Sequence, residues 1–211
     1  LSFAEEELFD WFDPKKRDTS DRDFNWYKKF WTRLAVSAKH ETVIPKLFSI
    51  STNVPAFQKR FPGAKILYMI RDPLNVLPSG LSLVTGVLDK RFGFWNLDED
   101  VKNRFINRLY NALLELLKRF HEDWENGSID RSKVLIIKYD YMMTNFEELM
   151  DDIFNFTGFS PTDKMKDEIR ITAEQQRKYE SSHKYNLEKF GLTEEQIKND
   201  CSFIYETYLT K

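Results

Sequence analysis

The sequence predicts an α/β protein in which a parallel sheet lies between layers of helices, a three-layer α/β/α arrangement. Residues 65–70 and 134–137 are short, almost wholly apolar runs of the kind that form buried strands. Segments with apolar residues at three- and four-residue intervals precede, separate and follow these runs, as amphipathic helices do. Strands that alternate with helices are typical of parallel sheets. The length of 211 residues suits one core, so we expect a single domain over residues 1–211.

The N-terminal part of the chain is predicted to be mainly helical. Apolar spacing predicts a short helix over residues 3–12, which stops before Pro14, and a longer helix over residues 24–39. The charged residues 13–23 between these helices are expected to form a loop. Residues 46–51 are apolar and β-compatible, and they therefore predict a strand.

The middle of the chain is predicted to hold a central strand and two longer helices. One or two helical turns are expected over residues 55–61, followed by a strand over 65–70 that is buried on both faces. Apolar spacing then predicts helices over residues 74–88 and 98–124. The second of these helices carries a single apolar stripe, formed by Phe105, Leu109, Leu113, Leu116 and Leu117.

The C-terminal part of the chain begins with the predicted strand over residues 134–137. Three helices are expected after this strand, over residues 145–156, 163–177 and 193–209. Thr193 and Gln196 have the spacing of a capping box, which marks the start of the last helix. Residues 178–191 read as a basic and aromatic loop.

The charge balance argues against a polyanionic partner for the whole molecule. The chain has 32 Lys and Arg and 34 Asp and Glu, so its formal net charge is only −2. Such a small charge creates no overall field that would attract nucleic acid. Any anionic ligand therefore has to be held by a local group of donors.

Cysteine and histidine usage excludes several further classes of protein. The single cysteine, Cys201, cannot form an intramolecular disulfide. His40, His121 and His183 lie far apart and form no metal-binding motif, so no metal is expected. No apolar run has the length of a membrane span and no signal peptide is recognised. We expect a cytoplasmic protein, and its oligomeric state, homo-oligomer included, stays open.

Arg71 and Ser79 are the first candidates for an anion site. Arg71 directly follows the predicted strand 65–70, and ligands of parallel α/β sheets bind beyond the carboxyl ends of strands. A guanidinium binds phosphate through two parallel hydrogen bonds. Ser79 lies eight residues on, about two helical turns away, and offers a hydroxyl to another oxygen. The alternative is that Arg71 and Asp72 only cap the helix and pair with each other.

This segment also resembles a known family. Residues 61–73, together with Ser79, resemble the strand and helix with which sulfotransferases hold the 3′-phosphate of 3′-phosphoadenosine-5′-phosphosulfate (PAPS). Arg71 and Ser79 match in residue type and in spacing. The resemblance implies a fold like that of the P-loop nucleotide hydrolases, PAPS as the co-substrate and no metal.

Two later segments extend the resemblance. Residues 134–149 resemble the family's strand that ends in Tyr-Glu-Asp-Leu, whose Tyr lines the adenine site, although Asp140 here replaces the Glu. Residues 182–192 are similar to the C-terminal loop of bacterial-type members. Donor contacts are implied for Tyr139, Ser182 and Lys184.

The acceptor side is less defined by the sequence. Many family members carry a Lys or His near the transferred sulfuryl group at the end of the strand predicted over 46–51, whereas this chain offers Ser51 and Asn53. We take these two residues and Trp95 as candidate acceptor contacts, with ordinary turn and core roles as the alternatives. Glu6 and His183 are the candidates for general acid–base catalysis.

One expected element is not found in the sequence. The family holds the 5′-phosphosulfate in an Arg-Ser-Gly-Thr-Thr-like turn at a helix N-terminus, and no such turn occurs here. Because the chain starts at Leu1 and the family places this loop earlier, we expect the loop upstream, so that this chain is the N-terminally incomplete remainder of the domain. The predicted function is sulfuryl transfer from PAPS to a hydroxyl or amine of a small-molecule or glycan acceptor. An inactive nucleotide-binding or scaffold protein and a P-loop kinase relative are the alternatives.

Overall fold

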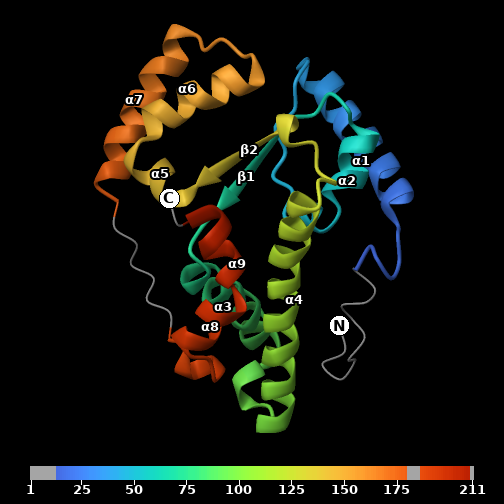
Figure 1. The fold of residues 1–211 in the computed structure, drawn as a ribbon, viewed down its shortest axis with the longest axis vertical. Helices are drawn as coiled ribbons and strands as arrows, with labels where there is room; N and C mark the ends of the chain where they lie inside the picture. The colour runs from blue at the N-terminus through green and yellow to red at the C-terminus, as the bar shows by residue number, and fades with distance from the viewer. Residues whose placement is uncertain (1–12, 180–185, 210–211) are drawn as a thin grey trace. The chain divides into compact units, whose positions relative to one another are not determined.

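The computed structural model describes residues 13–179 and 186–209 (Figure 1). The chain divides into two compact units. The first unit combines Leu1–Ala64 with Leu97–Asp130, and the second combines Lys65–Asn96 with Arg131–Lys211. The chain therefore crosses between the two units three times. The helix predicted over residues 3–12 lies outside the described residues, and the single domain stays a prediction.

The sheet belongs to the second unit. Strands β1 (Ile66–Ile70) and β2 (Val134–Lys138) pair in parallel, with Ile66 opposite Val134 and Ile70 opposite Lys138. The strands predicted over residues 65–70 and 134–137 and their parallel arrangement are confirmed. Within the described residues the sheet has these two strands, and most of the chain is helical, so the protein is a mostly helical α/β protein.

The prediction that β1 is buried on both faces is wrong. Its side chains alternate, with Leu67 and Met69 being 40% and 49% exposed while Ile70 is 3% exposed. A continuous apolar run is compatible with burial on one or both faces, because periodicity alone does not report what covers each face. On β2, Val134 and Ile137 are buried.

A long helix follows β1 in the second unit. Helix α3 (Pro73–Phe92) starts at Asp72, whose carboxylate accepts a hydrogen bond of 2.9 Å from the backbone N–H of Leu74. Pro73 occupies the first helical turn, where it costs no hydrogen bond. The helix ends at Gly93, which adopts a left-handed conformation with φ 65°.

Three helices form a group after β2, visible in Figure 1 beyond the tip of the β2 arrow. They are α5 (Tyr139–Thr144), α6 (Phe146–Thr157) and α7 (Asp163–Arg177), and each contacts the other two. Helices α6 and α7 confirm the helices predicted over residues 145–156 and 163–177. Helix α5 was not predicted, because its six residues are too few to show helical periodicity.

The C-terminal segment is not the single helix predicted over residues 193–209. It consists of α8 (Glu194–Asp200), α9 (Ser202–Ile204) and a π-helical turn, Tyr205–Leu209. The break falls at the fully buried Cys201, whose φ of −112° lies outside the helical region. The predicted N-cap is confirmed, since Thr193 Oγ1 accepts a hydrogen bond of 3.1 Å from the N–H of Gln196.

The first unit is built from helices α1 (Ser20–Ala38), α2 (Val54–Arg60) and α4 (Glu99–Glu125). Aromatic rings on one side of α1 pack edge-on against rings at α2, for example Phe24 against Phe57 with centroids 5.8 Å apart. Helix α1 begins at Ser20, so the loop predicted over residues 13–23 is shorter than expected.

The prediction of a strand over residues 46–51 is wrong. The structure has a 3₁₀ turn, Ser49–Thr52, in which the hydroxyl of Ser51 donates to the carbonyl oxygen of Phe48 at 3.3 Å. The backbone N–H of Asn53 also donates locally, to the carbonyl oxygen of Ile50. Ser and Asn side chains favour such local bonds over a sheet ladder.

The buried apolar residues of α4 are not those of the predicted stripe, and most of them follow a stripe residue by one position. The buried apolar residues are Ile106, Tyr110, Leu114 and Phe120. The leucines of the predicted stripe are half-buried on its flank. Apolar residues also occupy the positions next to the predicted stripe, so spacing alone did not locate the centre of the buried face. Among the described residues, no helix combines the length and the apolarity that a membrane crossing requires.

Candidate functional site

The two strands bring Arg71 and Tyr139 together. Each residue directly follows its strand, and the pairing of Ile70 with Lys138 sets both strand ends at the same edge of the sheet. The guanidinium carbon of Arg71 lies 4.2 Å from the centre of the Tyr139 ring. This is the distance of a cation–π contact, which fixes the plane of the guanidinium.

A hollow of about 480 Å³ opens at this edge. Helices α5 and α7 supply most of the other lining side chains. The lining residues are Arg71, Tyr139, Met143, Thr144, Gln176, Arg177 and Tyr179.

Arg71 has no ion-pair partner among the residues that the structure describes. The neighbouring carboxylate, Asp72, is engaged elsewhere, because it accepts hydrogen bonds from the N–H of Leu74 and from the hydroxyl of Tyr205. The alternative in which Arg71 and Asp72 pair with each other is therefore wrong. A half-buried guanidinium without a carboxylate in a hollow favours an anionic ligand.

Two residues at the end of α7 complete the polar lining, and sequence reasoning missed both. Arg177 pairs with Glu147 of α6 at 3.2 Å, and both side chains are well exposed. The side-chain oxygen of Gln176 is shielded from solvent and accepts no hydrogen bond within the described chain. A donor from a ligand or from water would satisfy such an oxygen. The available signal was the basic and aromatic character of the sequence that follows α7.

Ser79 and Trp95 lie in the same unit as Arg71 but do not line the hollow. Ser79 is half-buried on α3, and its hydroxyl makes no hydrogen bond in the described part of the chain. Trp95 lies in the 3₁₀ turn Phe94–Asn96, and the ammonium of Lys189 lies 4.1 Å from the centre of its ring.

The remaining predicted site residues fall elsewhere. Ser51 and Asn53 belong to the first unit, in and directly after the 3₁₀ turn Ser49–Thr52. Four predicted residues lie outside the described residues, namely Glu6, Ser182, His183 and Lys184. In residues 13–179 and 186–209, no group of three or more His, Cys, Asp or Glu side chains is placed to hold a metal ion.

Parallel strands, with a guanidinium at their carboxyl ends that forms no ion pair within the described residues, define an α/β protein with a candidate anion site at the sheet edge. A family model described as the sulfotransferase family matches residues 5–163. The chain belongs to this family. The match includes Arg71, Ser79 and Tyr139, whereas the C-terminal segment 182–192 lies beyond it. Searches of curated proteins and of solved structures find no match.

Proposed function

We propose that this protein transfers a sulfuryl group from PAPS to a hydroxyl or amine of a small-molecule or glycan acceptor. Membership of the sulfotransferase family supports sulfuryl transfer in general. The parallel sheet, with its ligand-sized hollow beyond the strand ends, is compatible with a three-layer fold like that of the P-loop nucleotide hydrolases. The oligomeric state is not part of the proposal.

The guanidinium of Arg71, which has no ion-pair partner in the described part of the chain, is the observation that carries the proposal. The 3′-phosphate of PAPS would accept two parallel hydrogen bonds from this group, which the Tyr139 ring holds in one plane. Ser79, whose hydroxyl is without a partner in the described chain, is proposed as a second donor. Arg177 adds a second positive charge to the hollow.

The rest of the hollow suits the nucleoside. We propose that the adenine ring lies near Tyr139, as the resemblance to the family implies. The buried oxygen of Gln176 is a suitable acceptor for an amino or hydroxyl donor of the nucleotide. The hollow of about 480 Å³ is in the range of small-ligand sites.

The proposed reaction is an in-line displacement at sulfur. A lone pair of the acceptor oxygen or nitrogen forms the new bond to sulfur, while the bond between sulfur and the bridging phosphate oxygen breaks. The electron pair of that bond leaves with 3′-phosphoadenosine-5′-phosphate (PAP), and the acceptor proton passes to a general base. Positioning and neutralisation of charge on the leaving phosphate supply the catalysis, as in phosphoryl transfer.

Other roles follow from the sequence and are part of the proposal. Glu6 and His183 are proposed for acid–base catalysis, and Ser182 and Lys184 for donor contacts. On the acceptor side we propose Ser51, Asn53 and Trp95. Ser51 already donates to a backbone carbonyl, so its hydroxyl would have to exchange this partner for the acceptor.

The first test is calorimetric titration of the 211-residue chain with PAP. We expect binding that Arg71→Ala weakens by at least about tenfold, because a charge-assisted contact contributes roughly 1.5–3 kcal/mol. The matched control is Arg91→Ala, which removes an exposed arginine in the last turn of α3 and should leave the affinity unchanged. A folded chain that binds PAP equally well with and without Arg71 would contradict the assignment of the site.

The second test measures transfer itself, with ³⁵S-labelled PAPS and a panel of hydroxyl, amine and glycan acceptors. Labelled product that depends on Arg71 is the expected result. PAP binding without any transfer would instead support the nucleotide-binding alternative, and transfer from ATP would support the kinase relative.

A further inference from the structure

A second hollow, of about 450 Å³, lies on the first unit between α1 and the end of α2. Four of its six lining residues are cationic. The lining consists of Asn25, Lys28, Lys29, Thr32, Arg33 and Arg60. Arg60 donates a hydrogen bond to the side-chain oxygen of Asn25, which orients the guanidinium. Within the described chain, none of the four cations forms an ion pair with a carboxylate.

The sequence around this hollow is strongly basic although the chain as a whole is not. Between Asn25 and Ala64 there are seven Lys and Arg residues and a single acidic residue, Glu41. The rest of the chain carries the excess of negative charge that brings the total to −2. A local positive region in an otherwise acidic chain attracts an anion to this face of the unit.

Two exposed aromatic rings lie beside the cations on α1. Trp26 and Phe30 stack with centroids 5.2 Å apart and an interplanar angle of 9°. Their side chains are 65% and 41% exposed, although other rings of α1 pack against α2. Lys29 and Arg33 follow Trp26 at three and seven residues, so they share its side of the helix.

We propose that this face, formed by Lys28, Lys29, Arg33 and Arg60 with Trp26, binds an acidic saccharide chain that bears carboxylate or sulfate groups. The cations pair with the acidic groups, and the open face of the Trp26 ring packs against the C–H face of a sugar ring. Asn25 and Thr32 supply hydrogen-bonding groups for sugar hydroxyls.

A saccharide fits these observations better than other anions do. A polynucleotide is disfavoured by the net charge of −2, and the hollow and ring pair are short compared with a polynucleotide groove. An acidic saccharide also has many hydroxyl groups that could accept a sulfuryl group. The inference that this saccharide is the acceptor rests on the proposed function, whereas its binding does not.

Affinity for a heparin-derived hexasaccharide, measured by calorimetry on the 211-residue chain, tests the proposal. We expect binding that weakens with added salt and that Lys29→Gln/Arg33→Gln reduces by about tenfold, since each exposed charge contact contributes modestly. Trp26→Ala should also reduce it. The control Arg104→Gln/Lys164→Gln removes one Arg and one Lys from exposed positions on α4 and α7 and should bind like the unmodified chain.

Equal affinity of the Lys29→Gln/Arg33→Gln variant and the unmodified chain would overturn the proposal. So would binding of maltohexaose, a dT hexamer or phosphatidylserine vesicles that is as strong as binding of the hexasaccharide. PAP titrations separate this site from the donor site. Hexasaccharide binding by a folded chain that does not bind PAP supports this proposal and contradicts the assignment of the donor site, whereas PAP binding alone overturns the saccharide site and leaves the proposed function standing.

Discussion

The hydroxyl of Tyr205 donates a hydrogen bond of 2.6 Å to Oδ1 of Asp72. The same oxygen accepts from the N–H of Leu74 at the start of α3. Tyr205 belongs to the C-terminal π-helical turn, so this bond ties the end of the chain to the residue next to Arg71. It also engages the carboxylate that follows Arg71 in the sequence, which leaves the Arg71 guanidinium available to an anion.

Replacing Tyr205 by Phe should lower the free energy of unfolding by about 1–2 kcal/mol, because Asp72 loses one of its two donors. PAP affinity should fall as well, since Asp72 becomes free to pair with Arg71. Urea denaturation and calorimetry measure the two effects. Tyr141→Phe is the control, as the hydroxyl of Tyr141 makes no hydrogen bond in the described chain. Unchanged stability in Tyr205→Phe would show that the bond contributes nothing.

The contact between Arg71 and the Tyr139 ring predicts a graded response. Tyr139→Phe keeps the ring and should bind PAP nearly as well as the unmodified protein. Tyr139→Ala removes the ring and should weaken PAP binding about tenfold, since a stacking contact contributes roughly 1–3 kcal/mol. The comparison is made by calorimetry, with Tyr141→Ala as a control on the same helix. Equal loss in Phe and Ala variants would point instead to the Tyr139 hydroxyl.

The pair between Arg177 and Glu147 predicts that removing a negative charge improves anion binding. Glu147→Gln leaves both guanidinium groups of the hollow without a carboxylate, so PAP affinity should rise about two- to fivefold. The pair is exposed, so the stability should change by less than about 1 kcal/mol. Glu148→Gln changes the adjacent exposed residue and serves as the control. A fall in affinity would mean that Glu147 holds Arg177 in its binding position.

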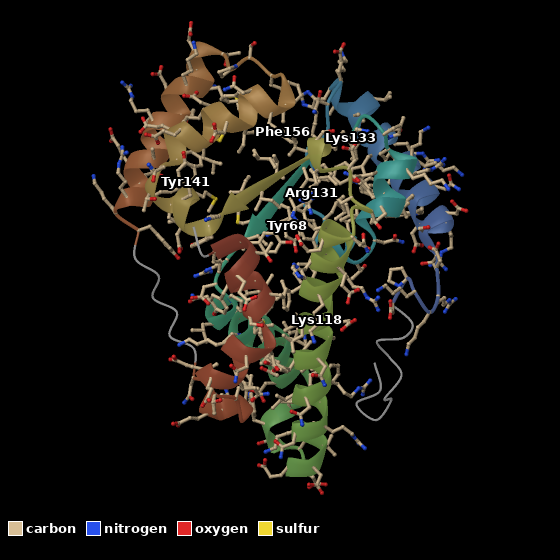
Figure 2. All side chains as sticks on the ribbon, in the orientation of Figure 1. Tyr68, Lys118, Arg131, Lys133, Tyr141 and Phe156 are labelled. Atoms are coloured by element: carbon tan, nitrogen blue, oxygen red, sulfur yellow. The ribbon has the colours of Figure 1, made fainter. Side chains whose placement is uncertain are left out.

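Tyr68 of β1, labelled in Figure 2, predicts a loss of stability at alkaline pH. Burial, and to a smaller extent the nearby Tyr208, raises the pKa of Tyr68 above its ordinary value. The unfolded chain therefore loses the Tyr68 proton at a lower pH than the folded chain does. The contribution of protonated Tyr68 to the free energy of unfolding is complete below about pH 9. It declines as the pH rises past about 10, by up to about 1.4 kcal/mol per pH unit.

Urea denaturation between about pH 8 and pH 11 tests this prediction. Below about pH 9, the free energy of unfolding of Tyr68→Phe should differ from that of the unmodified chain by a constant amount. Above about pH 10, it should fall less steeply than that of the unmodified chain. Parallel curves over the whole range would contradict the assignment.

The sequence predicted the parts of the second unit that depend on strong local patterns. Strands β1 and β2 were evident as apolar runs, and α7 was predicted with the bounds that it has in the structure. Arg71 became a candidate because ligands bind beyond the carboxyl ends of parallel strands, which needs only short-range information and one rule of topology. Tyr139 became a candidate through the resemblance of residues 134–149 to a strand of the family.

The failures concern features that depend on tertiary contacts. The exposed side chains of Leu67 and Met69 are indistinguishable in sequence from buried ones, since both faces of β1 are apolar. Residues 46–51 have the composition of a strand, but the hydroxyl of Ser51 forms a local bond instead. Arg177 belongs to a helix with many charged residues, and only the packing of α7 against α5 places it at the hollow.

Each unit is made of two segments, and the segments of the two units alternate along the chain. This order affects how the protein folds during synthesis. During translation, β1 emerges long before β2, and Asp13 long before Arg119, with which it forms a buried ion pair at 2.7 Å. Both contacts close large loops, which slows folding because the entropy of closure is lost before the contact is gained. The first unit is not complete until residue 130 has been added, and the second part of the second unit follows only after that residue, so a chain that ends between residues 65 and 129 lacks part of both units.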